Sequence, residues 1–442
     1  MIRNKRIAFL TLGCKVNSYE TEAMQALLTQ AGAVICEFHE EADVYVVNTC
    51  SVTNMADRKS RQMLHKARKQ NPEALIVAAG CYAQTAEVSA LKETGIDVIV
   101  GNNQKKDIVS ILNAYLAGRD NERLDIGKET EYEDLQLDTQ VEHTRAYIKI
   151  QDGCNQFCSY CIIPYARGRI RSRKPEDVIR EVERLAGAGY QEIVLTGIHL
   201  SSYGQPAKEG EQPLLDLIGA LDCIPGIKRI RLGSLEPRII TEDFVKALVE
   251  FKTVCPHFHL SLQSGSDTVL KRMNRKYTTK EYAASVEILK KYYASVAVTT
   301  DIIVGFPQET QEEFEETLQF AKNIGFSKIH VFKYSRRKGT VADKMNGQIP
   351  EQIKTERSEQ LIQTEEMLGK AYRQQMIGTG QRVLFEESAI VDGVVCQVGY
   401  NERYVRIAVK TQEDLSNQIR TVLVTGHAQK EETLFGEVWR EE

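Results

Sequence analysis

The sequence has no long hydrophobic run. No stretch approaches the ~18 consecutive apolar residues of a membrane-spanning helix. The first twelve residues carry Arg3, Lys5 and Arg6, and only a four-residue apolar run follows them. Such a run is too short for the core of a signal peptide. We therefore expect a cytoplasmic protein with no membrane partner.

The sequence also has little excess charge and few cysteines. Its formal net charge is −4 over 442 residues, which neither indicates nor excludes nucleic-acid binding, because affinity for phosphates depends on local patches. Ten cysteines are far too few for a disulfide scaffold of this length. In a reducing compartment, cysteines are more often metal ligands or catalysts. Internal repeats are absent as well, and the length predicts two or three domains.

Residues 1–118 alternate short apolar strands with helical stretches. The expected strands are Ile7–Leu12, Val44–Val47, Leu75–Ala79 and Val98–Val100. This alternation is typical of a parallel sheet covered by helices. Residues 119–143 are rich in acidic side chains and weak in apolar periodicity, and we interpret them as a linker or an irregular excursion.

A second series of six strand–helix units lies within residues 144–373. The expected strands are Tyr147–Ile150, Ile193–Thr196, Arg229–Leu232, Phe258–Leu262, Val296–Val304 and Lys328–Lys333. Thr278 with Glu281, and Thr310 with Glu313, fit the capping boxes that begin helices. Six units are too few for a closed eight-stranded barrel. We predict an open, partial (β/α)6 barrel, followed by a helix over Pro350–Arg373.

Residues 376–442 show a third pattern, in which strands follow one another without intervening helices. The expected strands are Arg382–Glu387, Val394–Gly399, Tyr404–Val409, Arg420–Val424 and Leu434–Trp439. Glycines lie near several of their ends. This pattern predicts a small antiparallel β-barrel of the oligonucleotide-binding type. The expected fold is therefore α/β, with a parallel N-terminal domain, a partial barrel and a small C-terminal β-barrel.

Three cysteines lie within eight residues directly after a predicted strand of the partial barrel. They are Cys154, Cys158 and Cys161, at the spacing C-x3-C-x2-C. Ligands of open α/β sheets bind at the carboxyl ends of the strands, where this loop lies. A tetrahedral zinc site needs four ligands, and no second pair completes the set. An iron–sulfur cluster with three cysteine ligands and one open iron fits the spacing. The alternative is a chance group of buried or zinc-bound cysteines.

Three further cysteines follow three successive predicted strands of the N-terminal part. Cys14, Cys50 and Cys81 each end one strand–helix unit. Neighbouring strands of a parallel sheet lie ~5 Å apart, so we expect the three thiols to meet at one edge. Gly13 and Gly80 would allow the backbone to approach closely there. A second cluster with an open iron suits three thiolates; the alternative is three buried small hydrophobic residues.

These motifs resemble those of the methylthiotransferase family of radical S-adenosylmethionine (SAM) enzymes. Residues 11–22, 48–53 and 80–84 resemble the three ligand motifs of its N-terminal domain, and C-x3-C-x-aromatic-C resembles the radical SAM signature. The resemblance covers essentially the whole chain, including a TRAM-type barrel from about Ile377. The run Gly13–Thr21 is similar to the MtaB-type branch, which acts on N6-threonylcarbamoyladenosine at position 37 of tRNA. The branch that acts on isopentenyladenosine tends to carry Gln-Met-Asn after the cysteine. The branch that modifies a ribosomal protein tends to carry Lys-Asn and Asp-Ser. Val16 and Tyr19 of this sequence depart from both patterns.

The resemblance implies two [4Fe–4S] clusters and two roles for SAM. One SAM donates a methyl group to sulfur at the N-terminal cluster, held by Cys14, Cys50 and Cys81. The other, at the cluster of Cys154, Cys158 and Cys161, yields a 5′-deoxyadenosyl radical that abstracts hydrogen from C2 of adenine. A side-chain base cannot remove the proton of an unactivated aromatic C–H bond, so the reaction requires the radical chemistry of a cofactor. The six cysteines are the catalytic and metal-binding residues that the resemblance implies.

Other residues at the strand ends are candidate SAM contacts. Gly197 follows the second core strand in a loop that resembles the family loop meeting the SAM amino group. The remaining candidates are Tyr160, Ser234, Glu236 and Gln263. Structural turns are the alternative for several of them. Asp301 lies within an apolar strand, and we expect its carboxylate to point into the barrel.

The implied partners are the tRNA anticodon stem-loop and a reductant protein such as flavodoxin; no sulfur donor is indicated. Five basic residues between Arg167 and Lys174 suggest phosphate contact; the alternative is a solvated loop in which some arginines pair with acids. The C-terminal region is net acidic, so RNA binding there rests on the resemblance alone. Two other functions stay open: a methylthiotransferase acting on a ribosomal protein side chain, and a non-catalytic iron–sulfur scaffold that binds RNA.

Overall fold

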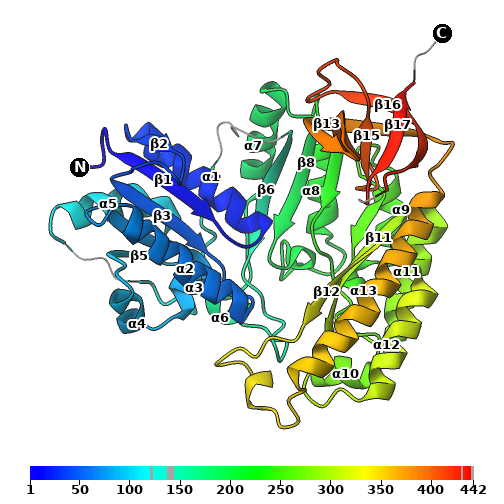
Figure 1. The fold of residues 1–442 in the computed structure, drawn as a ribbon, viewed down its shortest axis with the longest axis horizontal. Helices are drawn as coiled ribbons and strands as arrows, with labels where there is room; N and C mark the ends of the chain where they lie inside the picture. The colour runs from blue at the N-terminus through cyan, green and yellow to red at the C-terminus, as the bar shows by residue number, and fades with distance from the viewer. Residues whose placement is uncertain (120–122, 137–143, 430–431, 440–442) are drawn as a thin grey trace.

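The computed structural model describes residues 1–119, 123–136, 144–429 and 432–439. An N-terminal α/β part, a larger partial barrel and a small C-terminal barrel follow one another along the chain (Figure 1). Among the described residues, no helix combines the length and the apolar composition that crossing a bilayer requires. The α/β class and the order of the three architectures agree with the prediction.

The N-terminal part is a five-stranded parallel sheet with strand order β2-β1-β3-β4-β5. Its strands are β1 (Arg6–Thr11), β2 (Val34–Cys36), β3 (Val44–Thr49), β4 (Leu75–Ala79) and β5 (Val98–Val100). Its helices are α1 (Lys15–Gln30), α2 (Asn54–Gln70), α3 (Gly80–Thr85), α4 (Val88–Glu93) and α5 (Ile108–Leu116). All residues of β3 and β4 are buried, as expected for strands covered by helices on both faces. The three-residue edge strand β2 was not predicted.

The segment predicted as a linker is packed against the N-terminal part where the structure describes it. Its described residues form no helix or strand, which agrees with an irregular excursion. Leu135 is 1% exposed, and Glu133 accepts a hydrogen bond from the Lys106 backbone nitrogen at 2.9 Å. Residues 120–122 and 137–143 of this segment lie outside the described residues.

Six parallel strands form the open barrel of the core. They are β6 (Arg145–Asp152), β8 (Glu192–Gly197), β9 (Arg229–Leu232), β10 (His257–His259), β11 (Ala297–Val304) and β12 (Lys328–Lys333). A short antiparallel strand, β7 (Arg171–Ser172), pairs with β6. Isolated bridges such as Leu235–Leu260 join the β6–β9 sheet to the β10–β12 sheet. The predicted partial (β/α)6 architecture is confirmed.

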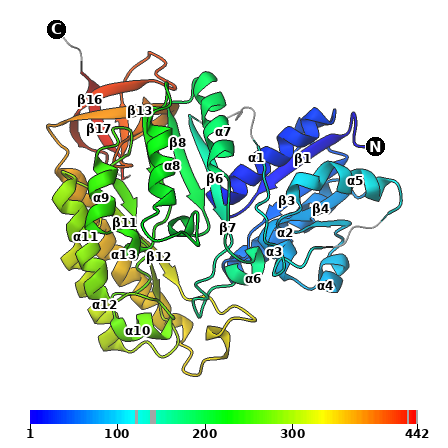
Figure 2. The ribbon, with the colours of Figure 1, turned by 180° about the vertical axis from the view of Figure 1, so that it is seen from behind.

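Helices cover the outside of this barrel (Figure 2). They are α7 (Pro175–Gly187), α8 (Pro213–Asp222), α9 (Glu242–Val249), α10 (Asp267–Arg272), α11 (Thr279–Tyr292), α12 (Gln311–Ile324) and α13 (Glu351–Gln374). The short helix α6 (Ile163–Arg167) lies instead against α3 of the N-terminal part. Short 3-10 helices cover Lys105–Asp107, Leu200–Ser202, Pro237–Ile239 and Ala342–Lys344. Both predicted capping boxes, at Thr278 and Thr310, are present.

The C-terminal strands close into a barrel of order β13-β14-β15-β17-β16. They are β13 (Gly380–Val391), β14 (Val394–Asn401), β15 (Arg406–Val409), β16 (Ile419–His427) and β17 (Leu434–Val438). The pairing of β15 with β17 is parallel, and the other pairings are antiparallel. Arg231 of β9 donates hydrogen bonds at 2.7 Å to the carbonyl oxygens of Asn401 and Glu402, so the barrel is fixed to the core.

Candidate active site

The N-terminal cysteines lie at the carboxyl ends of three adjacent strands, as predicted. Cys14 follows β1, Cys50 follows β3 and Cys81 lies in the first turn after β4. Gly13 has a φ of +109°, and a Cβ on it would lie 3.0 Å from Cys50 Sγ. This close approach requires glycine. Asn17 ties two of the loops together, because its amide donates to the carbonyl oxygens of Leu12 and Thr49 at 2.6 and 3.1 Å.

The thiols of this trio influence one another. Cys50 and Cys81 are buried, whereas Cys14 is exposed. Burial, together with the neighbouring Cys81 and Cys14, raises the pKa of Cys50 to about 11. Three thiols at one edge of a sheet are a natural site for a metal cofactor, since a metal displaces the protons and binds the thiolates.

The core cysteines lie on the loop that follows β6. Gly153 has a φ of +72°, and a Cβ there would lie 1.8 Å from the Arg169 carbonyl oxygen. The loop is held by a 3.0 Å hydrogen bond from the Cys154 backbone nitrogen to the Gly168 carbonyl oxygen. Burial raises the pKa of Cys154 to about 11 and that of Cys161 to about 12.

A cationic side chain accompanies the core trio. Arg275 Nη1 lies 3.4 Å from Cys158 Sγ, and the backbone nitrogen of Gln156 lies 3.5 Å from Cys154 Sγ. A guanidinium and a backbone N–H beside the sulfurs favour thiolate over thiol. The donor set therefore suits a negatively charged cluster.

The spacing of the sulfurs distinguishes a cluster from a single ion. Neither cysteine trio brings all three sulfurs within 4.8 Å of one another. Three thiolates bound to one tetrahedral zinc at ~2.3 Å lie ~3.8 Å apart. Both trios are therefore more open than the ligand set of a single zinc ion in this arrangement.

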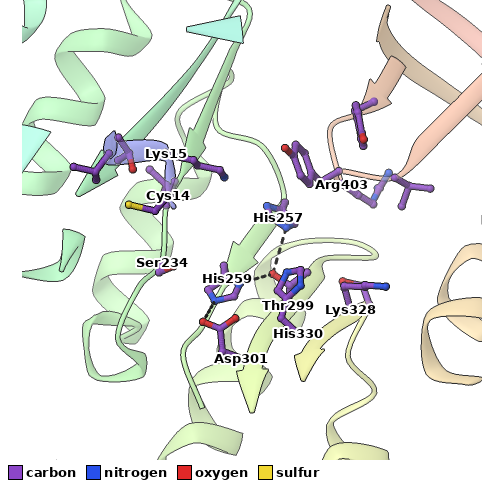
Figure 3. A pocket seen from close by; sticks show the side chains of 18 of the residues that line it. Cys14, Lys15, Ser234, His257, His259, Thr299, Asp301, Lys328, His330 and Arg403 are labelled. Atoms are coloured by element: carbon purple, nitrogen blue, oxygen red, sulfur yellow. Dashed lines mark hydrogen bonds and ion pairs between the residues drawn. The ribbon is translucent and has the colours of Figure 1, made fainter. Parts of the chain in front are cut away.

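A cavity of about 890 Å³ lies between the three parts of the chain. Its lining includes Cys14 from the N-terminal part, Gly197 and Ser234 from the core, and Tyr404 from the C-terminal barrel. Figure 3 shows Cys14 and Lys15 on one side of this space and the histidines of β10 and β12 on the other. Its volume is in the range of small-molecule and cofactor sites.

The other predicted SAM contacts lie outside this lining. Glu236 is buried, with one carboxylate oxygen 3.3 Å from His199 Nε2 and the other 2.7 Å from Arg238 Nε. Although burial raises the pKa of Glu236, hydrogen bonds from His199 and Arg238 lower it to about 2. Gln156, on the loop of the core cysteines, lies 3.3 Å from the same carboxylate. The structure thus brings Glu236 to the core trio.

Two predicted contacts have evident structural roles. Gln263 adopts a φ of +72°, and its backbone joins β11 through hydrogen bonds with Asp301 at 2.8 Å and Ile303 at 2.9 Å. Tyr160 packs edge-on against Phe306, with ring centroids 6.5 Å apart. Neither residue lines the cavity described above.

A histidine cluster that was not predicted lies on the cavity wall. His259, Asp301 and His330 lie on the adjacent strands β10, β11 and β12, with ligand atoms within 4.8 Å of one another. His259 Nε2 is 3.3 Å from an Asp301 carboxylate oxygen, and its Nδ1 is 3.0 Å from Thr299 Oγ1. Asp301 faces the lumen, as predicted. The register that pairs Asp301 with His330 is the signal that sequence analysis lacked.

A buried ionic network links the two cysteine loops. Glu20 of α1 contacts Lys149 and Arg167 at 2.7 Å and Lys105 at 3.1 Å. Asp152, two residues before Cys154, contacts Lys149 at 2.6 Å. Arg167 also donates a 2.8 Å hydrogen bond to Asn17. The network therefore fixes the N-terminal loop relative to the core loop.

This network corrects the interpretation of the basic run after Cys161 as a phosphate-binding patch. Arg167, Arg171 and Arg173 are at most 3% exposed, and Arg173 pairs with the buried Glu181. They point into the interior because acidic partners from other segments neutralise them there. Arg169 is exposed and lies over the Phe157 ring, 4.7 Å from its centroid.

Two family models match the chain. One is described as the Radical SAM superfamily and covers residues 148–321. The other is described as "Uncharacterized protein family UPF0004" and covers residues 6–101. The two matches coincide with the two parts of the chain that carry the cysteine trios.

Curated relatives match along almost the entire chain. "Threonylcarbamoyladenosine tRNA methylthiotransferase MtaB" of Bacillus subtilis (strain 168) is 43% identical over 95% of this chain and 93% of its own. The protein of the same name from Aquifex aeolicus is 37% identical over 95% of this chain and 100% of its own. "tRNA-2-methylthio-N(6)-dimethylallyladenosine synthase" of Protochlamydia amoebophila is 34% identical over 98% of this chain and 96% of its own.

Solved structures share the fold at low sequence identity. The radical SAM methyltransferase TsrM from Kitasatospora setae superposes with a TM-score of 0.58 at 15% identity, covering 77% of each chain. The cobalamin-dependent SAM radical enzyme OxsB superposes with a TM-score of 0.52 at 10% identity, covering 84% of this chain and 56% of its own. These likenesses concern the fold alone.

Proposed function

Because this chain belongs to the tRNA methylthiotransferase family of radical SAM enzymes, we propose that it adds a methylthio group to C2 of N6-threonylcarbamoyladenosine at position 37 of tRNA. The chain is a transferase of sulfur-containing groups, and its family implies SAM and a [4Fe–4S] cluster. The observation that carries the proposal is the cavity that Cys14, the core strand ends and the C-terminal barrel line together.

The two cysteine trios would hold the two clusters. We assign the SAM-binding cluster to Cys154, Cys158 and Cys161, and the second cluster to the trio of Cys14, Cys50 and Cys81. When bound, these groups supply the reductive cleavage of SAM to a 5′-deoxyadenosyl radical and the methylthio group that joins C2. The chain itself positions the reactants and excludes water from the shared cavity.

The residues around the core trio would position SAM. Gly197 and Ser234 line the cavity, and Glu236 lies beside the loop of the core cysteines. A carboxylate that stays ionised suits the ammonium or ribose hydroxyl groups of SAM. Tyr160 and Gln263 would act indirectly, by supporting the cysteine loop and the β10–β11 bridge.

The proposed macromolecular partner is the anticodon stem-loop of tRNA. A base must leave the stack to enter a cavity of this kind, and unstacking a loop base costs less free energy than unpairing and unstacking a paired one. The cavity lining from the C-terminal barrel, including Tyr404 and Arg403, would meet the RNA beside the reacting base. A flavodoxin-like protein would supply electrons.

Nucleoside mass spectrometry tests the proposed substrate. The anaerobically reconstituted protein is incubated with SAM, dithionite and tRNA that contains threonylcarbamoyladenosine, and the tRNA is then digested. We expect the methylthio derivative of that nucleoside. Unchanged tRNA together with a modified ribosomal protein would support the protein-modifying alternative, and the absence of SAM cleavage would support a non-catalytic scaffold.

A further inference from the structure

The cations that line the cavity differ in how they are neutralised. Lys328 forms ion pairs with Glu365, at 3.2 Å, and with Glu432. Arg373 lies 3.9 Å from Glu432. Arg403 donates a 2.7 Å hydrogen bond to the Ser295 carbonyl oxygen. These three side chains are committed to partners within the protein.

Lys15 lies in the same lining without such a partner. Of the described side chains, none places a carboxylate oxygen within 4.0 Å of its ammonium; its contacts are the rings of Tyr147 and Tyr404, whose centroids lie 5.9 and 5.7 Å from Nζ. Lys15 is exposed to the cavity. An ammonium between two aromatic rings keeps a donor free for an anionic ligand, because ring faces attract the charge without accepting its hydrogen bonds fully.

The surroundings of Lys15 add positive charge. The guanidinium groups of Arg145 and Arg231 lie 5.1 and 4.7 Å from the Tyr404 ring centroid. Both arginines form ion pairs with the buried carboxylate of Glu192, which also pairs with Arg229. One carboxylate therefore pairs with three guanidinium groups. Glu386 adds a second carboxylate, which pairs with Arg145. A carboxylate that binds at Lys15 would relieve this excess of positive charge.

Lys15 also lies beside the reacting end of the cavity. It follows Cys14 directly in the chain, and both side chains face the cavity (Figure 3). The opposite wall carries Asp301, which would repel an anion. A ligand whose anionic group lies near Lys15 therefore presents its neighbouring atoms to the sulfur of the N-terminal trio.

We propose that Lys15 binds the threonyl carboxylate of the substrate nucleoside and thereby selects an acidic N6 substituent. The inference rests on the proposed function and deepens it. Adenine C2 and the threonyl carboxylate belong to the same modified base. A cation next to Cys14 is therefore placed to hold the carboxylate while C2 reacts. In this role Lys15 is a specificity-determining residue rather than a catalytic one.

Binding of paired RNA ligands tests this role without turnover. One anticodon stem-loop carries threonylcarbamoyladenosine, and the other carries its neutral threoninamide. For the reconstituted protein we expect about 10- to 100-fold tighter binding of the acid, the range of a charge-assisted hydrogen bond. In Lys15→Met the preference should vanish while binding of the amide stays unchanged. Lys15→Arg should retain part of the preference.

Two controls separate this role from a structural one. Iron content and visible absorption of each variant show whether the clusters are intact. Lys291→Met, on the outer helix α11, removes a surface lysine paired with Glu242 and should keep the full preference. The proposal would be overturned if Lys15→Met lost affinity equally for both stem-loops, or if it kept the full preference for the acid. Failure of the wild-type protein to methylthiolate the acid stem-loop would instead overturn the proposed function. That outcome is measured on the wild type without any variant, so it is distinct from failure of the Lys15 proposal.

Discussion

At the scale of single residues, Glu20 forms ion pairs with three cations. Its carboxylate, together with Lys105, Lys149 and Arg167, is fully buried. Glu20 belongs to the helix that begins after Cys14, whereas Lys149 and Arg167 flank the core cysteine loop. Its pKa lies well below the usual range; burial alone would raise it, but the three cations lower it. One side chain thus joins the two halves of the site.

Removal of this charge should destabilise the fold. Glu20→Gln leaves three buried cations with one fewer anion, and breaking a buried ion pair costs about 3–5 kcal/mol. We expect the midpoint of thermal unfolding to fall by roughly 6 °C or more. Glu242→Gln is the matched control, because its pairs with Lys291 and Lys246 are exposed and worth little. Equal midpoints of thermal unfolding for the two variants would show that the Glu20 network does not stabilise the fold in this way.

At the scale of elements, the contact between core strands and the C-terminal barrel depends on Glu192 of β8. Arg229 and Arg231 of β9 bind Glu192 and donate to the barrel's carbonyl oxygens of Arg382, Tyr400, Asn401 and Glu402. The carboxylate therefore orients two arginines that connect separate elements. Although burial alone raises the pKa of Glu192, Arg231 and Arg145 lower it to about 2.

This depressed pKa predicts how stability depends on pH. A carboxyl group with a lowered folded-state pKa stabilises the protein above its unfolded pKa, ~4.5, and the contribution disappears as the pH falls towards 2. Its size is on the order of 3 kcal/mol. The gap in thermal midpoint between the wild type and Glu192→Gln should be constant above about pH 5 and narrow towards about pH 3. A gap that does not change with pH would contradict the assignment.

The elements also show what the sequence could predict. The strand ends after β1, β3 and β4 followed from apolar runs, because local periodicity locates strands and successive strands are often neighbours in a sheet. The burial of Arg167 did not follow, because its partner Glu20 lies 147 residues away. The cluster of His259, Asp301 and His330 depends on strand register, which short strands do not encode locally. Positions set by local pattern were predictable; positions set by distant partners were not.

At the scale of the whole molecule, the site exists only where the three parts meet. The N-terminal part resembles a βα domain without a complete pocket, and the core barrel is open; Cys14, Gly197 and Tyr404 share one cavity only in the assembled chain. Separate cysteine trios on separate parts imply separable tasks. We therefore propose a division of labour between two clusters, one for cleaving SAM and one for supplying sulfur.

The most direct measurement is the iron content of reconstituted wild type, Cys154→Ala and Cys50→Ala, combined with assays of SAM cleavage and of the methylthio product. Cys223→Ser, at an exposed cysteine, is the control. The account predicts about eight irons in the wild type and about four in each cluster variant. Cys154→Ala should lose SAM cleavage, and Cys50→Ala should keep it but form no methylthio product. Loss of SAM cleavage in Cys50→Ala with four irons retained, or about four irons in the wild type, would contradict the two-cluster account.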